Sequence, residues 1–336
     1  MEGERAKAVN YNAITGYISI GDRVILNTTA VELSLGTGGY HFVIYNKKHK
    51  EQTISNDLGH IMKLRYTPLQ FKCLAAEEQD SKYHDKFNSF KSLDNSIYIV
   101  GTLHSMLAPI ASVIKWLRPE LKITYIMTDA GALSLHFSKT VKRLKNEKII
   151  ENTITIGHAF GGDLECVNIY TGIIAAKTIA NSDVTIIAMG PGIVGTGTKY
   201  GFSGIEQGYI IDAVNKLGGL SFAVPRISFA DERERHKGIS HHTLTILNDI
   251  VSTKTNLALP VLNDEYADFI NNQIKSNDLD KKHNIFFENG SEVIDALNYY
   301  GLDVKTMGRS YYDDEAFFHT LGAVAKVAIN FLDSAQ

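Results

Sequence analysis

Five glycines follow closely on a short apolar run, and this feature restricts the possible fold more than any other in the chain. The run is Val184–Met189, and the glycines lie within residues 190–201. A run rich in β-branched residues that breaks into glycine is typical of a parallel strand that ends at an anion. Without Cβ atoms, such a loop turns tightly and its N–H groups approach a ligand closely. We interpret the segment as a ligand loop, and the alternative is a glycine-rich turn without a ligand.

The start of this loop matches a known phosphate-binding pattern only in part. Its first six residues, GPGIVG, fit G-x-G-x-x-G. In a dinucleotide-binding fingerprint, however, the helix opens within the glycines. Here the best predicted helix start is Ser203, which forms a capping-box pattern with Glu206. This departure favours hydrolysis or group transfer over hydride transfer at a nicotinamide.

The sequence pattern changes along the chain and predicts parts of different class. Residues 1–70 contain short strand-like segments joined by tight turns, which indicates a small, barrel-like β module. Residues 71–95 are polar and charged, and we expect a connector that carries a solvated helix. Residues 96–336 alternate apolar strands with helices, which predicts a Rossmann-like α/β domain with a doubly wound, mostly parallel sheet. Within that domain we expect one long helix over 164–180 and a strand over 302–307.

Composition and charge limit the partners that the chain can have. The formal net charge of −3 argues against a general nucleic-acid-binding surface. No run approaches the roughly eighteen apolar residues of a membrane span, and the N-terminus lacks the apolar core of a signal peptide. Cys73 and Cys166 are far apart and suggest neither a disulfide framework nor a cysteine zinc site. We therefore expect a cytoplasmic protein with a small-molecule partner, and a homo-oligomer stays open.

Polar side chains follow five consecutive predicted strands of the α/β domain. In open α/β sheets, ligands bind outside the carboxyl ends of the strands. A purely structural sheet does not need titratable groups along one edge, so we expect these groups to form a cleft. They include His104, Asp129, His158, Asp163, the glycine loop and residues 231–242.

The acidic and imidazole groups at these strand ends have structural alternatives. His158 and Asp163 suit a metal site or an acid/base pair, because imidazole and carboxylate serve both tasks. Asp163 is equally well placed to cap a helix. Asp129 is either a general base or metal-held carboxylate, or the cap of the helix that follows it.

The segment RISFADERERHKGISHHT, residues 226–243, is the richest in candidate groups. Its arginines suit bidentate binding of phosphate or carboxylate, and imidazoles at a helix start are held neutral as ligands or proton acceptors. Adjacent histidines on a helix point about 100° apart, so we expect at most one of His241 and His242 to face a given site. Three interpretations stay open: an anion site, a metal site completed by His104, His158 or Asp129, and a salt-bridged surface loop.

Several longer motifs resemble those of a known family. GDRVILNTTA, LGTGGYHFV, MGPGIVGTGT and RISFADERERHKGISHHT are similar to motifs of a bacterial family described only as a domain of unknown function. With GHIMKLRYTPLQ, MTDAGAL, AFGGDLE and MGRSYYDDEAFF, they extend over roughly Gly21 to Phe318. The resemblance implies a bacterial cytoplasmic protein, and it implies no activity and no catalytic residues.

These observations lead to one functional expectation: a hydrolase or group transferase that acts on a small anionic, phosphorylated or nucleotide-like metabolite. The expected ligand-binding residues are Gly190, Gly192, Gly195, Gly197, Thr198, Lys199 and Arg226. The expected catalytic residues are Asp129, His158, Asp163, His236 and His242. A divalent metal is a candidate cofactor, with His104, His158 and His241 as candidate ligands. The alternative is a non-catalytic metabolite-binding or regulatory protein that uses the same cleft.

Overall fold

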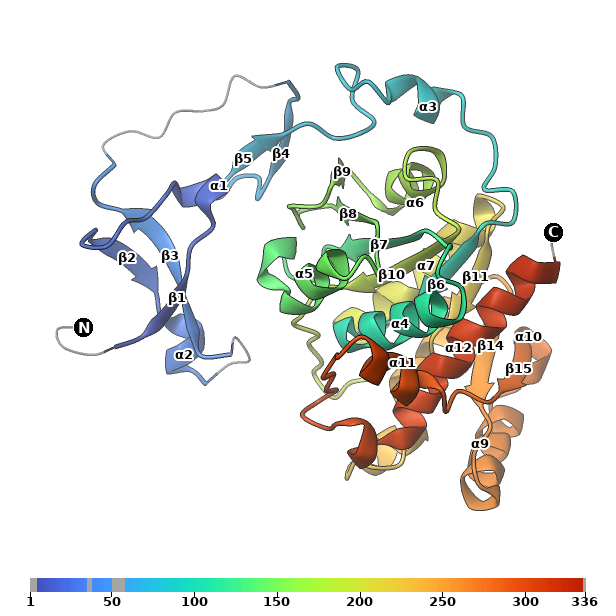
Figure 1. Cartoon of the computed structure of the whole chain (residues 1–336). Helices are drawn as coiled ribbons and strands as arrows, with labels where there is room; N and C mark the ends of the chain where they lie inside the picture. The colour runs from blue at the N-terminus through green and yellow to red at the C-terminus, as the bar shows by residue number, and fades with distance from the viewer. Residues whose placement is uncertain (1–4, 35–37, 50–57, 335–336) are drawn as a thin grey trace. The chain divides into compact units, whose positions relative to one another are not determined.

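The computed structural model describes residues 5–34, 38–49 and 58–334 (Figure 1). Contacts within the chain divide it into two units, Met1–Leu74 and Ala75–Gln336. The division falls inside the segment expected to be a connector. That segment contributes strand β5 (Phe71–Cys73) to the first unit and the short helix α3 (His84–Asn88) to the second.

The first unit contains a small sheet and a separate hairpin. Among its described residues, three strands form the sheet in the order β1-β3-β2, and β4 pairs with β5 in antiparallel fashion. These strands make no closed barrel within the described ranges. Residues 35–37 of the LGTGGYHFV motif lie outside the description. The elements are β1 (Lys7–Val9), α1 (Asn12–Thr15), β2 (Val24–Asn27), α2 (Thr29–Glu32), β3 (Tyr40–Asn46) and β4 (Ile61–Lys63).

A parallel sheet forms the second unit, as the alternating pattern predicted. In this unit, described up to residue 334, eight strands lie in the order β15-β14-β11-β6-β10-β7-β8-β9, and every neighbouring pair is parallel. All residues of the central strands β7 and β10 are buried, which is why both are continuous apolar runs. The strands are β6 (Ile97–Val100), β7 (Ile123–Thr128), β8 (Asn152–Ile156), β9 (Leu164–Cys166), β10 (Val184–Met189), β11 (Leu220–Ala223), β14 (Asn256–Pro260) and β15 (Asn284–Glu288).

Helices cover both faces of this sheet, so the doubly wound architecture is confirmed. One face packs against α4 (Leu107–Leu117), α5 (Lys139–Asn146), α11 (Val293–Tyr299) and α12 (Glu315–Ser334), with its own apolar core. The other face packs against α6 (Ile169–Thr178), α7 (Glu206–Lys216), α9 (Asp264–Ser276) and α10 (Leu279–Lys282). In Figure 1 the green α4 and the red α11 and α12 lie together in front of the sheet.

Two local predictions in the α/β unit were wrong. The predicted helix over 164–180 begins only at Ile169, because its first residues form the edge strand β9 and Asn168 caps α6 with its side chain. The predicted strand over 302–307 is a loop. There Thr306 pairs with Arg309 in a tight turn, which satisfies their backbone groups locally and leaves no need for a sheet neighbour.

A hairpin interrupts the chain after β11 and carries most of the candidate groups. Strand β12 (Ile227–Ser228) pairs in antiparallel fashion with β13 (Gly238–Ile239). The loop between them holds the 3₁₀ turn η4 (Glu234–His236), and the short helix α8 (His241–Thr245) follows directly. Ser240 caps α8 by accepting a hydrogen bond from the backbone N–H of His242. The hairpin therefore folds the segment 226–243 back on itself at the carboxyl end of β11.

No helix within the described ranges is both long enough and apolar enough to cross a membrane.

Candidate functional site

The sheet reverses its winding direction between β6 and β10. Strand β6 continues into α4 on one face, whereas its neighbour β10 continues into α7 on the other face. At such a switch point the loops after the two strands diverge, and their divergence opens a crevice at the carboxyl edge. The loops here begin at Gly101 and at Gly190. The winding alone therefore places a binding crevice between them.

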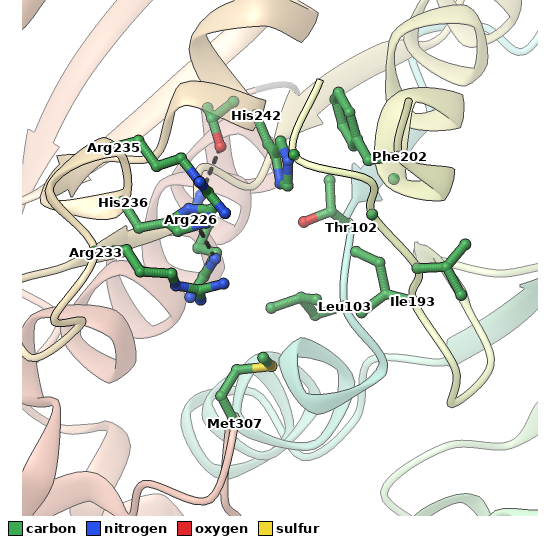
Figure 2. Close-up of a pocket in the computed structure, with 15 residues that line it drawn as sticks. Thr102, Leu103, Ile193, Phe202, Arg226, Arg233, Arg235, His236, His242 and Met307 are labelled. Atoms are coloured by element: carbon green, nitrogen blue, oxygen red, sulfur yellow. Dashed lines mark hydrogen bonds between the residues drawn. The ribbon is translucent and has the colours of Figure 1, made fainter. Parts of the chain in front are cut away.

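A pocket of about 150 Å³ lies at this crevice. Its walls come from four segments that are distant in sequence: the loop after β6, the glycine loop after β10, the hairpin after β11 and the loop between α11 and α12. Figure 2 shows Leu103, Ile193 and Met307 together on one wall and the guanidinium and imidazole groups on the opposite wall. The lining residues are Thr102, Leu103, Ile193, Val194, Gly195, Gly197, Phe202, Gly204, Arg226, Arg233, Arg235, His236, His242, Thr243 and Met307. The pocket therefore has one apolar side and one cationic side.

Three arginines supply the positive charge of the pocket. Arg226 is buried, and it donates to Nδ1 of His236 over 3.1 Å and to Asp231 over 2.7 Å. Arg233 binds both carboxylate oxygens of Asp231, through its Nε and one terminal nitrogen. Arg235 lines the pocket and, among the described residues, has neither a hydrogen bond nor an ion pair. Its five N–H groups are available to a ligand.

Asp231 is the carboxylate that holds this arginine group together. Its side chain is only 4 % exposed, and Arg309 approaches it to 3.7 Å in addition to Arg226 and Arg233. The hydrogen bonds from Arg233 and the surrounding guanidinium charges hold the pKa of Asp231 far below its usual value. Arg309 also donates to the buried Asp314. Three guanidinium groups thus contact two carboxylates, and Arg235 adds a fourth positive charge, so the arginine group carries net positive charge.

His236, His241 and His242 lie together beside the arginines. One ring nitrogen from each lies within 4.8 Å of those of the other two. His242 lines the pocket and His241 does not, which agrees with the expectation that at most one of the pair faces a given site. Their ring centroids nevertheless lie 4.1 Å apart, and the hairpin returns His236 to both.

Burial and positive charge keep these imidazoles neutral at pH 7. Desolvation, with further contributions from the neighbouring arginines, lowers the pKa of His236 to about 3. Desolvation and the charges of His241 and the arginines lower the pKa of His242 to about 4. The pKa of His241 is lowered for the same reasons. Neutral imidazoles can donate to an anion or bind a metal ion, but they are weak proton acceptors near neutrality.

The glycine loop contributes to the pocket with only some of its predicted residues. Gly195 and Gly197 line the pocket, whereas Gly190 and Gly192 do not. Several N–H groups of the loop are bonded within the loop itself, from Val194 to the Ser203 hydroxyl and from Thr196 to the Gly201 carbonyl. The arginine side chains are therefore better placed to bind an anion here than the backbone N–H groups of the loop.

Thr198 and Lys199 do not line the pocket either. The Thr198 hydroxyl bonds to Thr196 and to the backbone N–H of Gly201, so it closes the loop. Lys199 forms an ion pair with Asp249, with 2.7 Å between Nζ and Oδ2. Of the predicted ligand-binding residues, the structure brings Gly195, Gly197 and Arg226 to one pocket.

Asp129 lies apart from the pocket. It lies next to Glu206, for which the sequence predicted a capping role but no role in the site. Glu206 is 8 % exposed, accepts a hydrogen bond from Thr128 and interacts electrostatically with Asp129. Burial and the nearby Asp129 raise the pKa of Glu206 to about 7. One oxygen of Asp129, Oδ1, is buried and finds no hydrogen-bond partner in the described ranges of the chain. Glu206 was expected to form a capping box with Ser203, but α7 begins at Glu206 itself after a 3₁₀ turn (Ser203–Ile205).

The remaining predicted residues are placed elsewhere. Asp163 binds Lys145 and both the backbone and the hydroxyl of Thr153, so it fixes the start of the edge strand β9. His104 lies between the hydroxyls of Ser138 and Tyr125, and burial lowers the pKa of His104 to about 4. His158 does not line the pocket. In the part of the chain that the structure describes, the three-histidine group His236, His241 and His242 includes none of His104, His158 and Asp129.

Arg233 and Arg235 were expected as anion ligands within the segment 226–243, and both line the pocket. Several other pocket residues were not singled out from the sequence. Thr102 and Met307 gave no signal, because a threonine after a strand and an isolated methionine are common in any α/β protein.

Comparison with known proteins places the chain in a family. No curated protein matches it. A family model described as "Protein of unknown function (DUF3866)" matches residues 7–325, which cover most of both units and every residue of the pocket. The chain therefore belongs to the DUF3866 family of proteins of unknown function.

Proposed function

We propose that this protein is an enzyme, a hydrolase or group transferase, that binds a small phosphorylated or otherwise anionic metabolite in the pocket at the switch point. A bacterial, cytoplasmic setting is part of the same proposal, and the small number of cysteines is consistent with it. The observation that carries the proposal is the convergence of Arg226, Arg233 and Arg235 on one wall of the pocket.

The charge and shape of the pocket support an anionic ligand. Asp231 and Asp314 offset only part of the guanidinium charge, and Arg235 has its donors available. Guanidinium groups bind phosphate and carboxylate oxygens through paired N–H donors. The volume of about 150 Å³ is below the roughly 300–1,000 Å³ of typical ligand pockets, so it suits a phosphoryl group with the rest of the metabolite reaching outward.

The reaction class follows from what the pocket lacks in comparison with dinucleotide sites. The glycine loop closes on itself, and α7 begins only after it, so the helix does not open within the glycines. Hydrolysis or group transfer at an arginine-bound phosphoryl group fits this arrangement better than hydride transfer. The arginines would stabilise the charge that develops on the transferred group.

A non-catalytic role is the second candidate, and one observation favours it. A general base works best with a pKa near the operating pH, whereas the pKa of His236 is about 3 and that of His242 about 4. A metabolite sensor needs no such base. Sensor and enzyme would share the same anion site.

A binding screen followed by a turnover assay tests both candidates. Inorganic phosphate and a panel of small phosphorylated metabolites would be measured by thermal shift and by calorimetry with the wild type, R235Q and K199Q. We expect R235Q to weaken binding about tenfold or more, since a hydrogen bond to a charged group contributes about 1.5–3 kcal/mol. K199Q is the matched control, because Lys199 pairs with Asp249 outside the pocket, and its affinity should equal that of the wild type.

The outcomes separate the candidates. Phosphate release or transfer from a bound metabolite, above the rate without protein, supports the enzyme. Tight binding without turnover supports the sensor. Equal affinities of R235Q and the wild type would contradict the anion site itself.

A further inference from the structure

His236, His241 and His242 form a second set of groups at the edge of the same pocket, which His236 and His242 line, and the anion proposal leaves them without a role. We propose that the three imidazoles bind a divalent transition-metal cation such as Zn²⁺ or Co²⁺, and that the anion held by the arginines completes its coordination. Cation binding stands by itself, whereas the coupling to the anion rests on the proposed function.

The donor set and its spacing suit such a cation. Three histidines with an open fourth position form a known tetrahedral zinc arrangement. At metal–nitrogen distances of about 2.0–2.1 Å, tetrahedral ligand nitrogens lie roughly 3.4 Å apart. Here they lie within 4.8 Å of one another, so side-chain rotations that move each nitrogen inward by less than about 1 Å complete the set.

Each imidazole is placed to offer one ring nitrogen to the cation. Nε2 of His241 is buried and, among the described residues, has no hydrogen-bond partner. His242 stacks on Phe202 with ring centroids 4.0 Å apart, which fixes the plane of its ring. His236 uses Nδ1 for its contacts with Ser240 and Arg226, so Nε2 is its available atom.

Cation binding at Nε2 changes the tautomer of His236. Nδ1 then carries the proton and donates to the Ser240 hydroxyl, which lies 2.8 Å away. A metal-bound histidine usually donates a hydrogen bond from its other ring nitrogen to a neighbouring oxygen atom. Nδ1 can then no longer accept from Arg226, so one guanidinium N–H is released. The released donor lies on the pocket wall, where an anion can use it.

Electrostatics predicts that cation and anion assist each other. The arginine group carries net positive charge, which opposes a cation bound alone. An anion on the arginines removes that opposition and supplies an oxygen ligand. Linkage requires the effect to be mutual, so phosphate must tighten cation binding by the same factor by which the cation tightens phosphate binding.

Cobalt is the best probe, because tetrahedral Co²⁺ has a strong visible spectrum. The full-length protein would be titrated with Co²⁺ alone and then in the presence of inorganic phosphate. We expect one Co²⁺ per chain with a tetrahedral spectrum, and at least a tenfold gain in affinity with phosphate, within the usual range of coupling between sites. H241A should weaken Co²⁺ binding at least about 100-fold. Mutation of a group that only hydrogen-bonds to a metal ligand costs up to about 100-fold in metal affinity, and loss of a ligand itself should cost at least as much.

Two variants control for damage to the fold. H136A removes an exposed histidine outside the pocket and should bind Co²⁺ like the wild type. H241C replaces one ligand by another that such metals accept, and it should restore binding with a new sulfur-to-cobalt absorption band. Restored binding in H241C identifies position 241 as a ligand and excludes a purely structural role.

The outcomes distinguish the cation site from the anion site. Absence of Co²⁺ binding, or equal binding in H241A and the wild type, would overturn the cation site. Co²⁺ binding that phosphate leaves unchanged, although phosphate itself binds, would overturn the coupling. Co²⁺ binding that requires His241, in a protein that binds no phosphate with or without Co²⁺, would support the cation site and contradict the proposed function instead.

Discussion

Replacement of Asp231 by asparagine should separate the stability of the arginine group from its affinity for anions. The Asp231 side chain is 4 % exposed and lies 2.7 Å from Arg226 and 2.9 Å from Arg233. Removal of one partner from a buried pair costs about 3–5 kcal/mol, because the other charge stays buried without compensation. Arg233 is half exposed and asparagine keeps one acceptor, so we expect a loss below that range, about 2–3 kcal/mol, for D231N.

This loss should appear as a lower melting temperature at pH 7. At about 2–4 °C per kcal/mol for a domain of this size, the expected decrease is roughly 4–12 °C. D249N is the matched control, since Asp249 forms an exposed pair with Lys199, and such pairs contribute at most about 1 kcal/mol.

The pH dependence distinguishes lost charge from damaged packing. The pKa of Asp231 is depressed in the folded protein, so its stabilisation is present above the unfolded pKa of about 3.9 and is lost as the pH falls through the folded pKa. The difference in stability between wild type and D231N should therefore shrink below about pH 4.

The anion affinity of D231N should change in the opposite direction to its stability. One charge about 8 Å from a bound anion contributes about 1 kcal/mol at an effective dielectric constant of about 40, which is roughly fivefold in affinity. Phosphate should therefore raise the melting temperature of D231N more than that of the wild type. A variant as stable as the wild type at pH 7, or one that phosphate stabilises less, would refute this reasoning.

Three further substitutions test the buried acid Glu206 and the part of the glycine loop that lines the pocket. E206Q should raise the free energy of unfolding at pH 8 more than at pH 4. The pKa of Glu206 is raised to about 7, so the stabilisation that its protonated form gives is lost as the pH rises through that value, by an amount on the order of 3 kcal/mol. Equal effects of E206Q at both pH values in melting experiments would contradict a buried acid at this position. G195V should weaken phosphate binding about tenfold or more in calorimetry, because its side chain would start 3.6 Å from Phe202 and 3.8 Å from His242 on the pocket wall. G192V should instead cost about 1–3 kcal/mol of stability, since φ is +114° at Gly192. It should leave phosphate affinity unchanged, because Gly192 does not line the pocket. Weaker phosphate binding by G192V would show that Gly192 belongs to the binding site.

The sequence predicted the α/β sheet because its strands are buried on both faces and therefore read as continuous apolar runs. β7 and β10 are the clearest cases. The edge strand β9 was missed because a three-residue strand carries no periodicity, and the apolar residues after it belong to α6. The capping-box pattern of Ser203 and Glu206 misled for a related reason: sequence spacing does not show that the chain starts with a 3₁₀ turn and that Glu206 turns to Thr128.

The sequence could predict only those site residues whose position does not depend on the order of the strands in the sheet. Any residue after a parallel strand reaches the same edge of the sheet, so Arg226, His236 and His242 were found. Which strand ends are neighbours depends on the order in the sheet. β6 and β10 flank the switch point, whereas Asp129 and His158 follow β7 and β8, further along the edge. The assembly of all three histidines required the β12–β13 hairpin, whose two-residue strands are too short to recognise in a sequence.

The anion site can be observed in a crystal structure of the protein grown with inorganic phosphate. We expect one phosphate in the pocket after β6, β10 and β11, bound by Arg235 and by at least one of Arg226 and Arg233. A pocket filled only by water at saturating phosphate, or a phosphate bound at another place on the sheet edge, would contradict this expectation.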